Sequence, residues 1–328
     1  MSKIAIIGCN SFSGGFVVDK LLENSENEII GISREMKGPL FLPYLQKDTS
    51  RLRFFSMDLN KDMQILCDLL QTEKPEYIIN LAALSEVAPS WQHPEQWFET
   101  NVVALTKLVN FLKDLKSLKK YAHISSPEVY GTCEGSVKEN ACMNPTTPYA
   151  ASKAAADFSI MTFYKNFQFP AVLMRATNVY GAHQQLFKII PRSVIYLKTG
   201  KKIQLHGGGS AVKSYIHIHD VAQGYIDGMF KGRPGEIYHL SPDAGTAVKD
   251  VVRTICEIMG KNFEESTEMV AERLGQDKAY VIDSQKAHTE FGWYPTVPLR
   301  EGLEETITWV EKYWAEIQKQ PLEYIHRP

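Results

Sequence analysis

The sequence predicts an α/β fold, a doubly wound parallel sheet joined to a smaller mixed α/β lobe. Apolar runs of strand length alternate with amphipathic stretches, which is typical of βαβ units in a parallel sheet. This alternation continues to about Arg175 and then loosens. The chain has 328 residues, 44% of them hydrophobic, enough for one large core and a smaller lobe but too few for several independent domains.

The first half of the chain supplies the elements of the predicted sheet. Six apolar runs are expected to form its strands: 3–7, 28–33, 51–55, 76–82, 119–125 and 169–175. Four stretches between them carry the three-to-four residue spacing of helices with one buried face: 17–24, 62–71, 94–115 and 148–167.

The second half predicts the smaller lobe. Short strands, the glycine cluster Gly207 to Gly209 and a Pro-Gly turn at Pro234 precede helices that begin near Val248 and Arg300. We expect residues 1–178, completed by 214–244, to form the larger lobe, and 179–213 with 245–328 to form the smaller one. The sequence has no internal repeat and no long linker, so the lobes are expected to share a closely packed cleft.

Composition restricts the partners of the protein. The formal net charge is −2 and the pI is near 6.5, so no global field attracts nucleic acid or an anionic membrane, and a small-molecule partner is expected. No apolar run reaches the roughly 20 residues that span a bilayer, and a cytoplasmic location is expected. The five cysteines are scattered without the spacing of metal ligands and are interpreted as buried thiols.

Histidines also give no reason to expect a metal. No histidine pair has helical metal-ligand spacing with a carboxylate partner. His217 and His219 alternate as residues on a strand do, and a half-exposed strand face explains them better than a metal site. The sequence therefore predicts no metal.

A glycine-rich turn, IAIIGCNSFSGG, follows the first predicted strand. Nucleotide-binding turns space glycines as G-x-x-G-x-x-G, which lets the backbone approach a pyrophosphate at the N-terminus of the next helix. Gly8 and Gly14 hold the outer places, and Ser11 holds the middle one. A turn without a ligand is the alternative, but the strand-turn-helix context favours a Rossmann-like dinucleotide site. The turn residues expected there are Gly8, Asn10, Ser11, Phe12, Ser13 and Gly14.

The second predicted strand ends in GISRE, where an NAD site usually has an acidic residue for the adenosine ribose. Ser33 and Arg34 stand there instead. A hydroxyl followed by a guanidinium suits a 2′-phosphate, which favours NADP(H) over NAD. Glu35 lies close enough to favour NAD instead. The other alternative is that Arg34 is a solvated loop charge that binds no cofactor.

A serine, a tyrosine and a lysine form the strongest catalytic constellation. Tyr149 and Lys153 are four residues apart and therefore share one helical face, and Ser126 follows an upstream strand. A tyrosine with a pKa near 10 is a poor base at neutral pH, and lowering that pKa by three units takes about 4 kcal/mol. A nearby ammonium and an oxidised nicotinamide favour the phenolate. Tyr149 is thus expected to remove a substrate hydroxyl proton while Ser126 binds the same oxygen.

These motifs together resemble the extended short-chain dehydrogenases/reductases, in the nucleotide-sugar epimerase and dehydratase group. The resemblance covers nearly the whole chain and includes NLAALSEVAPSW, ETNVVALTKLV, TNVYGAHQQLFKIIPRSVIYLKTGKKIQLHGGG and ERLGQDKAYVIDSQKAHTEFGWYP. It implies a tightly bound NADP or NAD and a homodimer that pairs the helices beginning near Pro94 and Pro148. The further cofactor contacts that it implies are Asp58, Leu59, Leu81, Ala82, Ala83, Asn101, Tyr149 and Lys153; a helix N-cap is the alternative for Asp58.

Glu128, in HISSPEVYG, distinguishes the reactions of this group. Epimerases usually have a small or hydroxylic residue there, whereas the resemblance to 4,6-dehydratases implies a base for the C5 proton once C4 is a ketone. The dTDP-glucose dehydratases have an Asp-Glu pair, and Pro127 occupies the aspartate position. We therefore expect Glu128 to act as both base and acid. C4-epimerisation, UDP-glucuronate decarboxylation and a dinucleotide-binding regulatory module remain the alternatives.

Substrate contacts follow from the same resemblance. Lys213 stands where dehydratases generally place an arginine for the phosphates; lysine keeps the charge and loses the bidentate fork. The implied nucleotide-sugar contacts are Ser85, Glu86, Ser126, Asn178, Lys188, Lys213, Arg273 and Asp277. The base and the hexose are not specified by any of these side chains.

Overall fold

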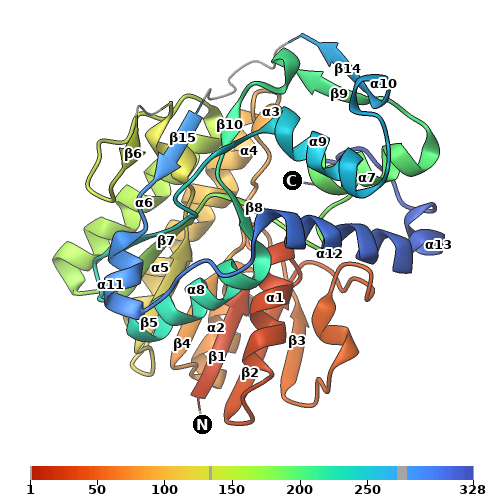
Figure 1. Ribbon diagram of the computed structural model, residues 1–328. Coiled ribbons are helices and arrows are strands. Elements are labelled where there is room, and N and C mark those ends of the chain that lie inside the picture. The colour runs from red at the N-terminus through yellow and green to blue at the C-terminus, as the bar shows by residue number, and fades with distance from the viewer. Residues whose placement is uncertain (1, 133–134, 272–278, 328) are drawn as a thin grey trace.

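In the computed structural model, which describes residues 2–132, 135–271 and 279–327, a seven-stranded parallel sheet forms the centre of the larger lobe (Figure 1). Its strand order is β12-β7-β5-β4-β1-β2-β3. The strands are β1 (Ser2–Ile7), β2 (Asn27–Ser33), β3 (Leu52–Ser56), β4 (Tyr77–Asn80), β5 (Lys120–Ile124), β7 (Ala171–Ala176) and β12 (Ile237–Leu240). The order reverses between β1 and β4, where the carboxyl ends of open α/β sheets leave a crevice for ligands.

Helices cover both faces of this sheet. Alternate residues of β1 point to opposite faces: Ile4 and Ile6 pack in one core cluster, Ala5 and Ile7 in another. The first face is covered by α1 (Phe12–Leu21), α8 (Ile218–Lys231) and α11 (Gln285–Phe291), and the second by α2 (Met63–Glu73), α5 (Leu105–Leu112) and α6 (Pro148–Phe167). The predicted doubly wound α/β class is confirmed.

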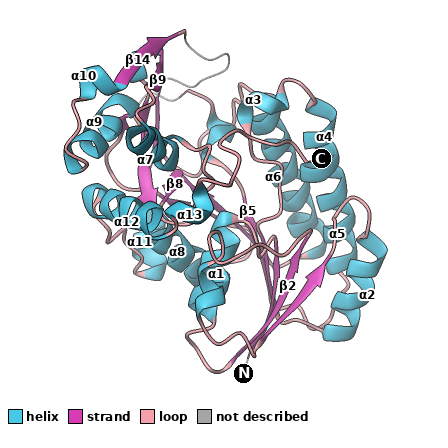
Figure 2. Cartoon of the chain, turned by 90° about the vertical axis from the view of Figure 1, so that its right-hand side faces the viewer, coloured by secondary structure: helices cyan, strands magenta, loops and turns pink. Residues whose placement is uncertain are grey.

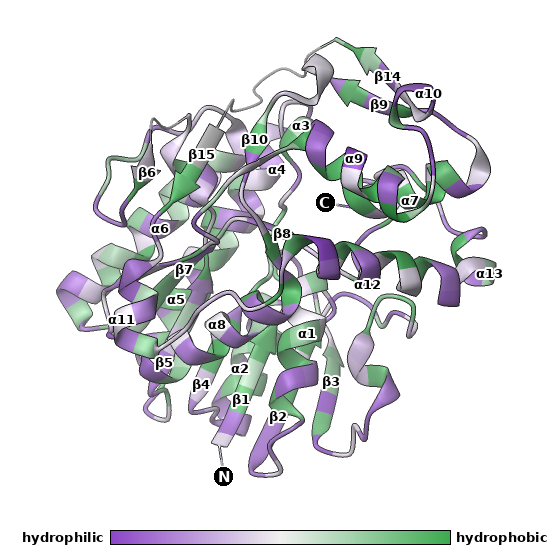
Figure 3. Cartoon of the chain, in the orientation of Figure 1, coloured by the Kyte–Doolittle hydropathy of each residue, from purple (hydrophilic) through white to green (hydrophobic). Residues whose placement is uncertain are grey.

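A separate hydrophobic cluster forms the core of the smaller lobe, in which α7, α9 and α12 lie close together (Figure 2). Hydrophobic and hydrophilic residues alternate along α12, as in a helix with one buried face (Figure 3). The helices of this lobe are α7 (Ile189–Thr199), α9 (Val248–Ile258), α10 (Phe263–Ser266), α12 (Leu299–Lys312) and α13 (Trp314–Ile317), and β9 (Ile203–His206) pairs with β14 (Thr267–Val270). The domain boundaries stated above stay predictions.

Two further small sheets lie between the main elements. One has the order β13-β10-β15-β6, and in the other β11 pairs with β8. Their strands are β6 (Ser136–Val137), β8 (Asn178–Tyr180), β10 (Val212–Lys213), β11 (Tyr215–His217), β13 (Thr246–Ala247) and β15 (Ala279–Ile282). Short helical turns complete the fold: η1 (Pro43–Gln46), α3 (Val87–Ser90), η3 (Pro127–Tyr130) and η4 (Gly207–Gly209). Within the described ranges, no helix combines the length and the apolar composition needed to cross a bilayer.

Two local predictions were wrong. His217 and His219 do not alternate on a strand, because His217 ends β11 and caps α8, with its Nδ1 3.5 Å from the backbone N–H of His219. The helix expected over 94–115 is also divided. It consists of α4 (Pro94–Phe98), a π-helical segment η2 (Glu99–Ala104) and α5.

Asn101, inside the π-helical segment, ties the second face of the sheet together. Its side chain accepts a hydrogen bond from Leu84 N–H (2.9 Å) and donates to the Leu84 carbonyl (3.0 Å) and to Ser152 Oγ (2.9 Å). Leu84 follows β4, and Ser152 lies on α6 between Tyr149 and Lys153. The π-helical turn therefore holds α6 against the segment that follows β4, a role that the sequence did not indicate.

Replacing Asn101 should destabilise the fold measurably. Asn101→Ala leaves the buried Leu84 N–H and carbonyl without their partner, and we expect the free energy of unfolding to fall by about 1–3 kcal/mol. Urea denaturation measures this loss. Asn110→Ala, at an exposed position on α5, is the matched control and should change stability by less than about 0.5 kcal/mol. Equal stability of the two variants would contradict the assigned tethering.

Candidate active site

A cavity of about 320 Å³ opens at the carboxyl ends of the central strands and contains the predicted catalytic group. Ser126, Glu128, Tyr149 and Lys153 all line it, so residues from β5, the following turn and α6 meet in one space. Other predicted residues on its wall are Ser11, Phe12, Ser13, Leu81, Ala83, Ser85, Glu86, Asn178 and Lys188. The sequence analysis missed Thr177, Gln184, Gln185 and Tyr225 on the same wall.

The glycine-rich turn shows how a serine replaces the usual middle glycine. Ser11 caps α1: its Oγ accepts from Gly14 N–H (3.1 Å) and donates to the Gly8 carbonyl (2.7 Å). The hydroxyl is thereby bonded to the turn itself. Gly8 has φ +87°, and a Cβ there would lie 2.7 Å from Ala82 N. The backbone of Gly8 therefore lies directly against that of Ala82, and α1 begins at the crevice. A helix N-terminus in this position suits a dinucleotide pyrophosphate.

A second cavity, of about 220 Å³, continues the crevice past β2. Ser33 and Arg34 lie on its wall, and Ser33 Oγ accepts from Asn10 N–H at 3.0 Å. Asp58 Oδ1 accepts from Asn60 N–H (2.8 Å), while Asp62 holds the N-cap position of α2, so Asp58 is not the helix cap. The predicted cofactor residues on this wall are Gly8, Asn10, Ser11, Ser33, Arg34, Asp58, Leu59, Leu81, Ala82 and Ala83.

Glu128 projects from a short 3₁₀ turn that Pro127 begins. Ser126 caps this turn, and its Oγ accepts from Glu128 N–H at 3.2 Å. Proline suits the first position of such a turn because its fixed φ is already helical and its missing N–H would have no partner there. The proline therefore sets the direction of the chain directly after Ser126 and leaves the half-buried Glu128 on the cavity wall.

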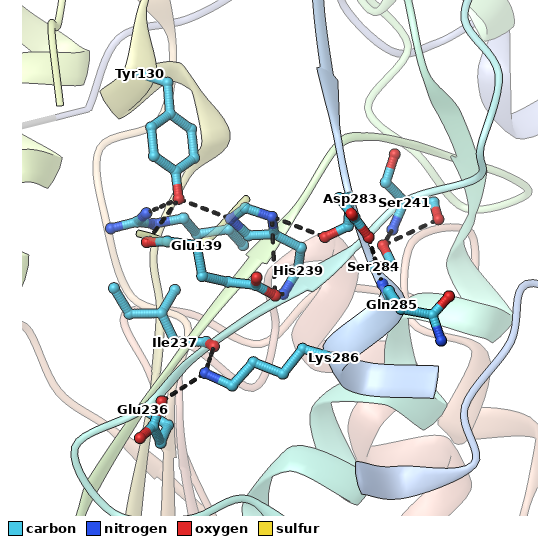
Figure 4. Close-up of polar contacts among 11 residues, drawn as sticks. Tyr130, Glu139, Glu236, Ile237, His239, Ser241, Asp283, Ser284, Gln285 and Lys286 are labelled. Atoms are coloured by element: carbon cyan, nitrogen blue, oxygen red, sulfur yellow. Dashed lines mark hydrogen bonds and ion pairs between the residues drawn. The ribbon is translucent and has the colours of Figure 1, made fainter. Parts of the chain in front are cut away.

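The end of the same turn is anchored in the protein interior through Tyr130 (Figure 4). The phenol lies 2.7 Å from His239 Nε2 and accepts from the Arg175 guanidinium. His239 Nδ1 lies 3.1 Å from the Asp283 carbonyl, which can only accept, so this nitrogen carries the proton and Nε2 accepts from Tyr130. Burial, with Arg175 second, lowers the pKa of His239 to about 3, which keeps the ring neutral.

A buried ion pair joins this turn to the catalytic helix. Arg175 Nη2 lies 2.7 Å from Asp157 Oδ2, and both side chains are fully buried. Ser125 Oγ donates to the same carboxylate at 2.6 Å. Asp157 lies one helical turn beyond Lys153 on α6. An arginine within the apolar run AVLMRA is the signal by which sequence reasoning could have found this pair.

The electrostatic states of Tyr149 and Lys153 follow from their burial. Burial raises the pKa of the Tyr149 phenol, the Glu128 carboxylate raises it further, and a hydrogen bond with Ser126 lowers it. Burial lowers the pKa of Lys153 to about 8, against the opposing charge of Asp157. Lys153 Nζ donates to the Ile124 carbonyl (2.7 Å) and lies 3.3 Å from His123 Nε2. Because burial holds the pKa of His123 well below its usual value, this imidazole is neutral.

The predicted substrate residues lie in different places. Glu86 and Lys188 form an ion pair of 2.8 Å across the mouth of the cavity. Asn178 lies in β8, and its N–H donates to the Ser214 carbonyl at 3.0 Å. Lys213, in β10, is not among the described residues that line the cavity. Arg273 and Asp277 lie outside the described residues.

The comparison with protein families agrees with this geometry. The family model for GDP-mannose 4,6 dehydratase matches residues 5–306. The chain belongs to this family. Membership confirms the resemblance to the extended short-chain dehydrogenases/reductases of the nucleotide-sugar dehydratase group. Among curated relatives, the human dTDP-D-glucose 4,6-dehydratase is 30% identical over 328 residues, which cover 97% of this chain and 93% of the human protein.

Solved structures of this family have the same fold. The dTDP-glucose 4,6-dehydratase of Streptomyces venezuelae, with NAD and TYD bound, aligns with a TM-score of 0.88 and 28% identity, covering 96% of this chain and 98% of that one. The UDP-glucuronic acid 4-epimerase of Bacillus cereus, with UDP-glucuronic acid and NAD, aligns with a TM-score of 0.86 and 26% identity, covering 94% and 99%. The fold therefore hosts both chemistries, and the site residues must separate them.

The pKa of Lys153 should be well below that of an ordinary lysine. With ε-carbon-labelled lysine, NMR should show one resonance with a midpoint near pH 8, because burial disfavours the ammonium. The unfolded chain then binds more protons than the folded one between about pH 8 and 10.5, so this group's contribution to stability rises with pH across that window.

Two lysine variants assign that resonance. It should vanish in Lys153→Met and persist in Lys165→Met, which removes an exposed lysine of the same helix. A spectrum in which no lysine titrates near pH 8 would refute the assigned environment.

Proposed function

We propose that this protein converts a nucleotide-diphosphate hexose into its 4-keto-6-deoxy product by intramolecular redox dehydration. One observation carries this proposal: Glu128, Ser126, Tyr149 and Lys153 line a single cavity beside the glycine-rich turn. An epimerase needs the last three residues but has no use for a carboxylate in that position. A dehydratase needs all four.

The roles of the side chains follow from their placement. Tyr149, with Ser126 bonded to it, removes the proton of the C4 hydroxyl, and Lys153 on the wall of the same cavity supplies positive charge. A bound nicotinamide dinucleotide supplies a hydride acceptor at C4 and a hydride donor at C6. Once C4 is a ketone, the C5 proton is acidic, and the Glu128 carboxylate takes it.

Glu128 also completes the elimination. The residue before it, Pro127, has no proton to donate, so the carboxylic acid formed at Glu128 gives its proton to the C6 oxygen, which leaves as water. One proton leaves C5 and reaches the C6 oxygen, and the carboxylate is restored. The hydride returned to C6 is matched by a proton at C5, which Glu128 takes from solvent and delivers, while Tyr149 releases the C4 hydroxyl proton to solvent, so the sum of the steps is the loss of one water.

The dinucleotide is proposed to be NADP(H), with NAD as the alternative. Arg34 and Lys37 on the wall of the second cavity offer cationic groups to a 2′-phosphate. Glu35 on the same wall suits the ribose hydroxyls of NAD, and the Streptomyces venezuelae and Bacillus cereus structures hold NAD. Titration of the purified protein with both dinucleotides decides between them.

The oligomeric state and the cellular location of the protein are also proposals. We infer a homodimer that pairs the α4-to-α5 region with α6 of a second copy. Exposed apolar side chains on these elements, Phe98, Val103, Phe158 and Phe167, support this pairing. A cytoplasmic location suits a nucleotide-sugar substrate.

Glu128→Gln should bind the dinucleotide normally and lose dehydration by about 10²- to 10⁴-fold, because the amide cannot accept the C5 proton. The assay is mass spectrometry of the product after incubation in deuterated water. Water loss with deuterium at C5 is expected of the unchanged protein, and neither water loss nor deuterium at C5 is expected of the variant.

Tyr149→Phe is the matched comparison, because it removes the first proton transfer instead of the second. Reduced nicotinamide should accumulate with sugar in Glu128→Gln and not in Tyr149→Phe, as followed by absorbance. Normal water loss by Glu128→Gln would disprove the role of this residue. A product of unchanged mass from the unchanged protein would establish epimerisation, and loss of carbon dioxide from a uronic acid would establish decarboxylation.

A further inference from the structure

The last described residues cross from the smaller lobe to the cofactor side of the larger one. After α13, residues 321–327, here named the strap, run towards α4 and the end of β2, and the last described residues lie beside α4 (Figure 2). The strap follows no helical or strand pattern. Its position is fixed by side-chain contacts at three points.

His326 makes the first contact. Its ring stacks on Trp97 with the planes 8° apart and the centroids 5.2 Å apart, and on His93 at 5.6 Å. Its Nε2 lies 2.6 Å from Gln96 Oε1, and Nδ1 lies 3.1 Å from the Tyr324 hydroxyl. Trp97 is fully buried, so the imidazole packs on a fixed surface of the larger lobe.

The second contact joins the strap to the two residues that follow β2. Arg327 Nη1 lies 2.6 Å from Glu35 Oε2, and Arg34 Nη1 donates to the Arg327 carbonyl at 2.9 Å. Arg34 and Glu35 line the second cavity, where the sequence places the adenosine ribose. The strap thus binds the pair of residues on which the choice between NAD and NADP depends.

The third contact lies at the smaller lobe. The Tyr324 ring packs edge-on against Phe187, with centroids 5.4 Å apart and planes at 77°. Phe187 precedes Lys188, whose ammonium pairs with Glu86. The strap is therefore anchored on both sides of the crevice.

A cavity of about 690 Å³ lies between the strap and the cofactor side. Residues of the strap line one side of it, and Arg34, Glu35 and Lys37 line the other. These three residues also line the second cavity, so the two spaces share a wall. Burial lowers the pKa of Lys37, and the charges of Arg327 and Arg34 lower it further, against the opposing effect of Glu35. The wall of this cavity carries the cations of Arg34, Lys37 and Arg327 beside the carboxylates of Glu35, Glu86, Glu316 and Glu323, so groups that suit a phosphate and groups that suit ribose hydroxyls lie side by side.

We propose that the strap is the outer wall of the dinucleotide site and holds the adenosine end of the cofactor between turnovers. This inference rests on the proposed function, in which the dinucleotide is regenerated in every cycle and has no need to leave. Slow release is then compatible with fast turnover. His326 and Arg327 are the residues that fasten the wall.

Dissociation of NADH and of NADPH from the full chain tests this proposal without any sugar. Reduced dinucleotide fluorescence is followed after a chase with excess oxidised dinucleotide. Two variants are compared with the full chain: a chain ending at Gln320 and the double variant His326→Ala/Arg327→Ala. For whichever dinucleotide binds, the dissociation rate of each variant should be at least about 10-fold higher than that of the full chain. Lys319→Ala, which removes an exposed charge just before the strap, should release it at the original rate.

The outcomes separate the two proposals. Faster release with an unchanged melting profile of the dinucleotide-free protein supports the strap, whatever sugar reaction the protein catalyses. Release at the original rate from both strap variants, when both are folded by circular dichroism, overturns it.

Discussion

The buried ion pair between Arg175 and Asp157 is the constraint on which the rest of the site depends. Asp157 belongs to the helix that carries Tyr149 and Lys153, and Arg175 also bonds Tyr130, which ends the turn carrying Glu128. Two elements with the catalytic groups are thus joined through one interior cation. Removing one partner of such a pair typically costs about 3–5 kcal/mol, because the other charge is left buried and uncompensated.

This arrangement explains why the turn after β5 tolerates a proline beside the catalytic carboxylate. The backbone direction is set at one end by Ser126 and Pro127 and at the other by the bonds of Tyr130 to Arg175 and His239. The space in front of the turn is left for substrate. A carboxylate held in this way can approach one edge of a hexose while Tyr149 approaches the neighbouring hydroxyl.

The fold, and the cavity that Ser126, Glu128, Tyr149 and Lys153 share, were predictable because their signals are local. The strands alternate with helices at regular intervals, and Tyr149 with Lys153 needs only helical spacing. The residues that tie these elements together give no such signal. Asn101 lies in a π-helical turn, which interrupts the periodicity expected of an α-helix. Arg175 contacts Asp157 and Tyr130 only after β7, α6 and the turn have packed together. The boundary between β11 and α8 was missed because His217 serves both elements.

The same limit applies to residues 321–327, which have no periodic pattern and acquire their place from contacts made over more than 200 residues of sequence. Long-range contacts of this kind are visible only in the folded chain. Together with the cavities, they support the proposal that residues 321–327 close one side of the dinucleotide site.

We propose that the interior ion pair aligns Glu128 and Tyr149 on one edge of the same sugar. A crystal structure with dinucleotide and a slowly reacting nucleotide hexose measures this alignment directly. We expect the Glu128 carboxylate next to C5 and within about 2.6–3.2 Å of the C6 oxygen, with the Tyr149 hydroxyl at the C4 oxygen. A Glu128 carboxylate turned towards solvent while Tyr149 holds C4 would contradict it.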